Sequence, residues 1–113
     1  MTAKELAERY DPNEKCPILH AMELIGSKWK MPILWYLAIE EELHYNELRR
    51  AVGDVSNTAL TRCLRELERD GLIVRHAADT RQPSVTYTLT EIGKELVPSM
   101  TDIFVWGDKI LHM

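Results

Sequence analysis

The chain has 113 residues, 14 Lys and Arg against 18 Asp and Glu, and a formal net charge of −4. Its length is that of one small domain, and 45% hydrophobic with 28% charged residues excludes a disordered tail or a fibre. The negative total argues against a protein that coats nucleic acid without selectivity, because such proteins carry a large basic excess. Half of the 14 basic residues nevertheless lie between residues 44 and 87.

Membrane and catalytic functions find no support in the sequence. No run approaches the about 20 apolar residues of a membrane span, and the start MTAKELAERYDPNEKCP lacks a signal peptide's apolar segment, so we expect a cytoplasmic protein without a membrane partner. A phosphate-binding glycine loop, a nucleophile elbow and an HExxH motif are all missing, which predicts no enzyme and no cofactor. The four histidines and two cysteines are scattered, so no metal site is expected.

The first part of the chain predicts three helices. Residues 2–9 are suited to a short helix, which the prolines of DPNEKCP end. A second helix is expected between Cys16 and Gly26, because the proline after the cysteine is well tolerated at the first helical position. Ser27 is expected to cap a third, buried helix, whose start Pro32 leaves uncertain by a turn. EEELHY then indicates an acidic loop that runs into a short extended piece.

Two more helices follow, and the second has an unusual order of charges. NELRRAV predicts a short helix, and Ser56 then caps a longer one that ends at Gly71. On a helical wheel its leucines gather on one face, whereas Thr58, Thr61, Arg62, Arg65 and Arg69 gather on the other. Arg62 and Arg65 precede every acid of this helix, which reverses the order that the helix dipole favours. The pattern indicates that an anionic partner outside the helix interacts with the arginines near its start.

The last part of the chain predicts a hairpin and a long helix. LIVRH and SVTYTL read as two strands joined by ADTRQP. Residues 90–113 are expected to form one helix that Thr90 caps and Pro98 bends. The apolar stripe of this helix consists of Ile92, Leu96, Met100, Ile103 and Phe104. One small core cannot cover that stripe, so we expect it to pair with a second subunit.

This order of elements is that of a winged helix-turn-helix domain, whose second helix enters the major groove of DNA. We expect a mainly α fold with a small β-hairpin wing (α+β), in which residues 1–113 form one DNA-binding domain with dimerisation helices at both ends. Double-stranded DNA is the expected partner. The candidate DNA contacts are Ser56, Asn57, Thr58, Thr61, Arg62, Arg65 and Arg69 on the helix, Arg81 and Gln82 at the hairpin tip, and Lys28 and Lys30 as backbone contacts.

Other interpretations of this pattern stay open. Any single arginine is equally well explained by a solvated face with acidic neighbours, and the whole face would also suit a winged-helix module that binds an acidic protein. A repressor that senses a small ligand without thiol chemistry is a third interpretation. Trp29, Trp35 and Trp106 are more typical of core or dimer contacts, but a cavity between the core and the dimer helices could hold an apolar effector.

Five short motifs point to a known family. They are CP (16–17), IG with KW (25–29), NELR (46–49), LREL (64–67) and YTLTEIG (87–93). Over about residues 16–107 the chain resembles the HxlR family of bacterial winged helix-turn-helix regulators, which are relatives of the MarR type. The resemblance implies a homodimer, held by its N-terminal and C-terminal helices, that binds an inverted-repeat operator with half-sites about 34 Å or a multiple apart. Thr58 and Cys63 depart from the residues that many members carry, so the family's base preference does not transfer.

Cys16 has two interpretations. A thiol at a helix start, with Lys15 beside it and His20 one turn on, is in surroundings that favour thiolate, and some HxlR-like regulators use a cysteine at this position to sense oxidants or electrophiles. The alternative is a small capping or packing residue. Cys63 lies between the two faces of its helix, where packing is favoured.

Overall fold

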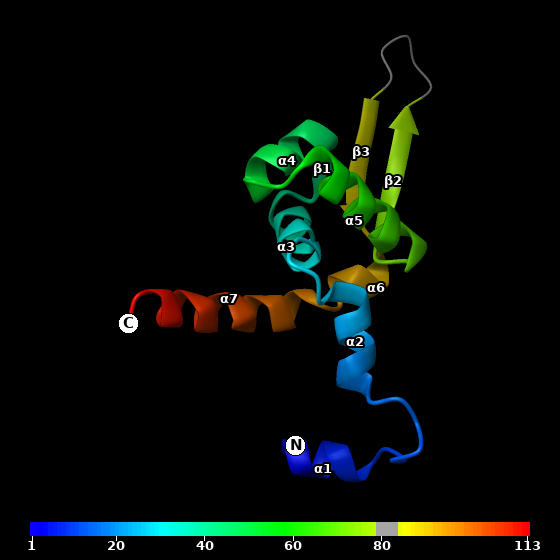
Figure 1. Ribbon diagram of the computed structural model, residues 1–113, viewed down its shortest axis with the longest axis vertical. Coiled ribbons are helices and arrows are strands. Elements are labelled where there is room, and N and C mark those ends of the chain that lie inside the picture. Colours follow the sequence, from blue (N-terminus) through cyan, green and yellow to red (C-terminus); the bar gives the residue numbers. More distant parts are fainter. Residues whose placement is uncertain (79–83) are drawn as a thin grey trace.

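The computed structural model describes residues 1–78 and 84–113. Its elements in chain order are α1 (Ala3–Glu8), α2 (Pro17–Ile25), α3 (Lys30–Glu40), β1 (Glu42–His44), α4 (Tyr45–Val52), α5 (Asn57–Arg69), β2 (Ile73–Ala78), β3 (Ser84–Leu89), α6 (Glu91–Lys94) and α7 (Val97–Leu111). Helices α3, α4 and α5 gather beside the sheet, whereas α1, α2 and α7 project from this body as arms (Figure 1). The prediction of a mainly α fold with a small β wing is confirmed.

The sheet has three antiparallel strands in the order β1-β3-β2. The short extended piece before α4 is β1, which pairs with β3 so that Leu43 lies opposite Tyr87. On the other side of β3, the same tyrosine lies opposite Arg75 of β2. The wing is therefore a hairpin whose second strand is also held by the segment that leads into the helix-turn-helix.

The core lies between α3, α4, α5 and the sheet. Its fully buried side chains include Ile33, Leu34, Leu37, Leu48, Leu60 and Leu67. The leucine face of α5 is the face that the periodicity predicted, and Cys63, only 1% exposed, packs beside it. The inner face of α5 is thus held by apolar contact with the core, which leaves its polar face outward.

The end of α5 is held by backbone hydrogen bonds. Gly71, at φ 80°, donates its N–H to the carbonyl of Glu68 at 3.0 Å, and the N–H of Leu72 reaches the carbonyl of Leu67 at 2.9 Å. This is the Schellman arrangement, which glycine favours because the left-handed region is open to it. Thr90 then ties the turn to α6, because its hydroxyl donates to the Gly71 carbonyl at 2.7 Å.

Two helix boundaries differ from the prediction. Residues 90–113 form α6 and α7 rather than one bent helix, and the break falls before Pro98. Its ring and its missing N–H would disrupt the bond to the carbonyl four residues earlier, so the chain restarts with this proline in the first turn of α7. Ser27 does not cap α3, which begins at Lys30 after Trp29.

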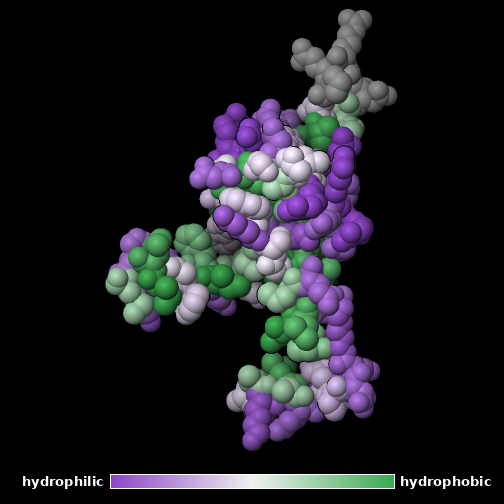
Figure 2. Space-filling view, viewed as in Figure 1, coloured by the Kyte–Doolittle hydropathy of each residue, from purple (hydrophilic) through white to green (hydrophobic). Residues whose placement is uncertain are grey.

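The arms carry exposed apolar side chains. No residue of α1 is buried, and Ile18, Leu19 and Met22 of α2 are exposed. Along α7 the exposed apolar residues are Ile103, Phe104, Val105, Trp106, Ile110 and Leu111. Figure 2 shows this hydrophobic colouring over α7 and α2, in contrast to the hydrophilic body above them. None of the helices in residues 1–78 and 84–113 is both long enough and apolar enough to cross a bilayer.

Candidate nucleic-acid interface

The start of α5 is polar, capped and free of acids. Ser56 Oγ accepts a hydrogen bond from the Ala59 N–H at 3.1 Å, as the sequence predicted. Asn57 and Thr58 are exposed in the first turn, which contains no Asp or Glu. The dipole of the helix and its free N–H groups therefore favour an anion at this end.

Arg62 and Arg65 are exposed on the outer face of α5. Within residues 1–78 and 84–113, neither guanidinium makes an ion pair or a side-chain hydrogen bond. The positive charge of Arg62 contributes to lowering the pKa of Glu66, one turn further on, but the main cause is the hydrogen bond from Lys30. Both arginines thus present their donors to solvent.

Arg69 differs from the other two. It lies in the last turn of α5, and its Nε donates to Asp70 Oδ1 at 3.2 Å. This hydrogen bond raises the pKa of Arg69. A paired guanidinium at the far end of the helix is poorly placed for contact with the same ligand as Asn57.

Tyr45 connects the two helices of the helix-turn-helix. Its hydroxyl is 3.1 Å from Asn57 Oδ1, 3.2 Å from the Asn57 carbonyl and 3.2 Å from Thr61 Oγ1. Tyr45 was not among the predicted contacts, because EEELHY indicated a loop and an extended piece rather than the start of α4. It brings two of the predicted contact residues into one hydrogen-bonded group.

A hollow of about 490 Å³ lies between α5 and the wing. Its lining includes Thr61 and Arg65 from the helix and Arg75 from β2. Arg75 was missed by the sequence analysis, although strand alternation places it on the same face as the buried Ile73. That face is turned toward α5, so beyond the core the arginine extends the basic surface of the helix.

Helix α4 adds a second concave surface. Asn46, Arg49, Arg50 and Gly53 line a hollow of about 350 Å³. Arg49 is partly engaged, because its Nε donates to the Val55 carbonyl at 3.4 Å, whereas Arg50 is exposed. This basic edge of α4 was not among the predicted DNA contacts.

The two predicted lysine contacts differ in exposure. Lys30 is 4% exposed, and its Nζ is 2.6 Å from Glu66 Oε2, so the expectation that it contacts DNA is corrected. A buried ammonium paired inside its own chain has no donors to offer a phosphate. Lys28 is exposed in the α2–α3 connection, with its ammonium 4.6 Å from the centre of the Trp29 ring. Arg81 and Gln82 lie outside the described residues.

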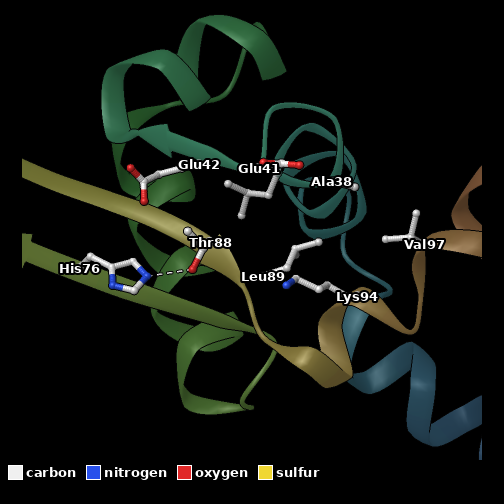
Figure 3. Close-up of a pocket in the computed structure, with 9 residues that line it drawn as sticks. Ala38, Glu41, Glu42, His76, Thr88, Leu89, Lys94 and Val97 are labelled. Atoms are coloured by element: carbon white, nitrogen blue, oxygen red, sulfur yellow. Dashed lines mark hydrogen bonds between the residues drawn. The ribbon is translucent and has the colours of Figure 1, made fainter.

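A different pocket, of about 670 Å³, lies on the opposite face of the sheet. Figure 3 shows Glu41 and Glu42 near its rim, and His76 with its Nε2 hydrogen-bonded to Thr88 Oγ1 at 2.8 Å. Lys94 also lines the pocket, where its Nζ pairs with Glu91 at 3.3 Å. Carboxylates at the rim make this face a poor surface for phosphate, which distinguishes it from the α5 side.

The cysteines differ in exposure. Cys16 is exposed as the N-cap of α2, without a side-chain capping bond, and Cys63 is buried, as predicted. Lys15 and His20 were expected to act on Cys16, but both lie against Glu23, whose pKa the Lys15 hydrogen bond lowers. Across the described part of the chain, no cluster of three His, Cys, Asp or Glu residues could hold a metal ion.

Comparison with known proteins identifies the family. Residues 24–113 match the family model of the HxlR-like helix-turn-helix proteins. The chain belongs to the HxlR-like helix-turn-helix family. It is 39% identical, over 88% of its length and 77% of the relative's, to the uncharacterized HTH-type transcriptional regulator YdeP of Bacillus subtilis. The HxlR-like relatives are thus transcriptional regulators rather than enzymes.

Solved structures of a redox regulator share this fold. The redox regulator HypR in its oxidized form has a TM-score of 0.76 and 38% identity, over 83% of this chain and 96% of that one. Its reduced form gives the same TM-score at 37% identity, over 83% and 92% of the two chains. These scores confirm the winged-helix architecture.

Proposed function

We propose that this HxlR-like protein is a homodimer that binds an inverted-repeat operator in duplex DNA and thereby regulates transcription in the cytoplasm. The observation that carries the proposal is the outward placement of Arg62 and Arg65, which form no ion pair within residues 1–78 and 84–113, on a helix whose opposite face is buried in the core. Forked guanidinium donors match guanine edges and phosphate oxygens, and no ion pair with a described residue has to be broken before they bind.

The surrounding surface supports the same ligand. The major groove is about 12 Å wide and admits one helix, so the start of α5 can approach base edges. Arg75 on the wing side and Arg50 on the α4 side flank that helix, where the two phosphate backbones would run. Each phosphate contact would add affinity but no sequence specificity. Base-edge contacts from Asn57, Thr58 and Arg62 would supply the specificity.

The dimer rests on the apolar arms. Residues 1–113 would form one DNA-binding domain in which α1, α2 and α7 make the dimer contacts. Exposed apolar residues on two neighbouring arms are typical of a subunit interface, and a two-fold axis would turn the two α5 helices toward successive major grooves. Half-sites about 34 Å apart, or a multiple of this distance, are the geometric expectation.

Replacement of Arg65 by Ala tests the contact. Affinity for the operator should fall by about 1–3 kcal/mol if Arg65 binds a base, or the salt slope should fall by about one if it binds phosphate. The matched control is Arg9→Ala, which removes the same charge from an exposed position after α1. The operator itself would come from selection of duplexes from a random pool. An inverted repeat supports the proposal, and an unenriched pool contradicts it.

Thiol regulation is a second candidate function. We infer that Cys16 makes the regulator responsive to oxidants or electrophiles, because its thiol is exposed at the start of an arm and the chain is similar to a redox regulator solved in two redox states. Oxidation of the Cys16 thiols of both subunits to a disulfide would release two protons and pass two electrons to the oxidant. Addition of an electrophile to one thiolate would instead place bulk at the arm.

Replacement of Cys16 by Ser tests whether this thiol carries the response. The wild type should change its operator affinity after treatment with a quinone or mild peroxide, and intact mass should distinguish a linked dimer from an adduct. Cys63→Ala is the control, because its thiol is buried. An unchanged response in Cys16→Ser would remove this residue from the mechanism, whereas a wild type that does not respond at all would favour a small ligand as the effector. Equal, weak binding of all duplexes by wild type and Arg65→Ala would favour a module that binds an acidic protein.

A further inference from the structure

The hydroxyl of Tyr45 is the centre of a hydrogen-bonded group at the start of α5. Tyr45 is the first residue of α4 and is half-buried, so its ring is held by the packing of the two helices. Its three oxygen neighbours are the side-chain and backbone oxygens of Asn57 and the hydroxyl of Thr61, all at 3.1–3.2 Å. The ring thus fixes the Tyr45 hydroxyl beside the side chains of Asn57 and Thr61 on α5.

The hydrogen bond from Tyr45 to Oδ1 orients the Asn57 amide. A tyrosine hydroxyl has one proton to donate, and Thr61 can donate its own proton to the tyrosine oxygen. The Tyr45 proton is then shared by the two oxygens of Asn57, with Oδ1 at 3.1 Å and the backbone carbonyl at 3.2 Å. Because Nδ2 lies on the other side of the amide carbon, its two N–H donors face away from Tyr45. Asn57 is itself exposed, so those donors face solvent.

We propose that Tyr45 is a positioning residue that makes Asn57 a donor-only reader of base edges, an inference that rests on the proposed binding of DNA by α5. A free asparagine pairs with adenine through both atoms of its amide, because adenine offers N7 as acceptor and N6–H as donor. With Oδ1 turned toward Tyr45, the N–H groups are the part of the amide that faces the groove. They match guanine, with acceptors at N7 and O6, or the O4 of thymine, and they reject cytosine, which offers a donor.

Removal of one oxygen atom tests this inference. Tyr45→Phe keeps the ring and its packing but frees the Asn57 amide to turn. In selections from a random duplex pool, the base that faces Asn57 in each half-site should shift toward adenine by about 3- to 10-fold, the value of one neutral hydrogen bond. The salt dependence of binding should not change, because no phosphate contact is lost. The matched control is Tyr36→Phe, on α3, which should select the wild-type operator.

A double-mutant cycle makes the test specific for the pair. In an Asn57→Ala background, Tyr45→Phe should have no further effect on base preference, since there is no amide left to orient. An unchanged preference at every position in Tyr45→Phe overturns the inference, as does an equal shift with and without Asn57. A thermal melt that matches the wild type shows that the variant is folded.

A measurement without DNA separates this inference from the proposed function. In the free protein, nuclear Overhauser contacts of the Asn57 side-chain amide protons should define one conformer, which Tyr45→Phe should average. If the pool selection fails for the wild type but this difference is found, the DNA proposal fails while the positioning role stands. If the selection succeeds and the amide is already averaged in the wild type, Tyr45 has no positioning role.

Discussion

Lys30 and Glu66 join the first residue of α3 to the third turn of α5 through a buried ion pair. The ammonium is almost fully enclosed, and the carboxylate is partly exposed. The hydrogen bond and charge of Lys30 lower the pKa of Glu66 below its usual value of 4.5. A group with a lowered pKa in the folded state stabilises the fold above its unfolded pKa, and this contribution is lost as the pH falls through the folded value.

Replacement of Lys30 by Met should therefore flatten part of the acid dependence of stability. The difference in free energy of unfolding between wild type and Lys30→Met should be constant above pH 4.5 and shrink below it, because protonated Glu66 no longer gains from Lys30. Urea unfolding at a series of pH values measures this. Lys94→Met, which removes an exposed lysine, provides the comparison. A gap that stays constant to pH 3 would contradict the expected coupling.

The outer face of α5 could be predicted from sequence, because its polar and apolar residues alternate with the period of a helix and Ser56 marks its start. The burial of Lys30 could not be predicted, since a lysine near a helix start is expected to be exposed unless its ion pair with Glu66 is known. Tyr45 and Arg75 were missed for the same reason. Their places depend on how α4 and β2 pack against α5, which sequence spacing does not encode.

At the scale of elements, α6 is a short spacer that fixes where α7 leaves the body. Thr90 caps it, because its hydroxyl accepts a hydrogen bond from the Gly93 N–H at 3.1 Å, and its N–H donates to the Leu72 carbonyl at 3.1 Å. A Cβ atom built on Gly93 would lie 2.3 Å from that same carbonyl oxygen. The close approach thus joins the turn after α5 to the start of the C-terminal arm. The sequence suggested the cap at Thr90 but not this contact, which involves two backbones.

Gly93→Ala should destabilise the protein, because the added methyl group must displace a hydrogen-bonded backbone. Overpacking of this kind costs about 1–3 kcal/mol, which thermal or urea unfolding would detect. A melting midpoint equal to that of the wild type would mean that α6 moves aside without loss, and would contradict the tight joint described here.

At the scale of the whole molecule, α5 and the arms α1, α2 and α7 are separate parts of one chain. The molecule extends over 56 × 37 × 23 Å because α7 and α1–α2 project from the body (Figure 1). Trp35 of α3 and Phe104 of α7 stack at a centroid distance of 5.0 Å, which holds the middle of α7 against α3. Beyond this contact the arm is apolar and exposed in a single protomer. The sequence predicted this surplus of apolar surface, although not the angle at which the arm leaves.

Trp106→Glu should weaken the proposed dimer. Trp106 is 65% exposed in the protomer, and a tryptophan buried at an interface typically contributes at least about 2 kcal/mol, so the dimer dissociation constant should rise by about 30-fold or more. Sedimentation velocity at micromolar concentration measures this. Lys109→Glu, on the same helix, tests whether charge alone is responsible. A Trp106→Glu protein that sediments as the wild type does would place the interface elsewhere.

The buried thiol of Cys63 provides a probe for local opening of α5. A bulky maleimide can reach this atom only in molecules whose α5 has lifted from the leucines beneath it, because the side chain is 1% exposed. In a Cys16→Ser background, the rate of maleimide labelling would therefore report how often α5 opens. Saturating operator duplex should lower that rate, since a helix seated in a groove has no room to lift.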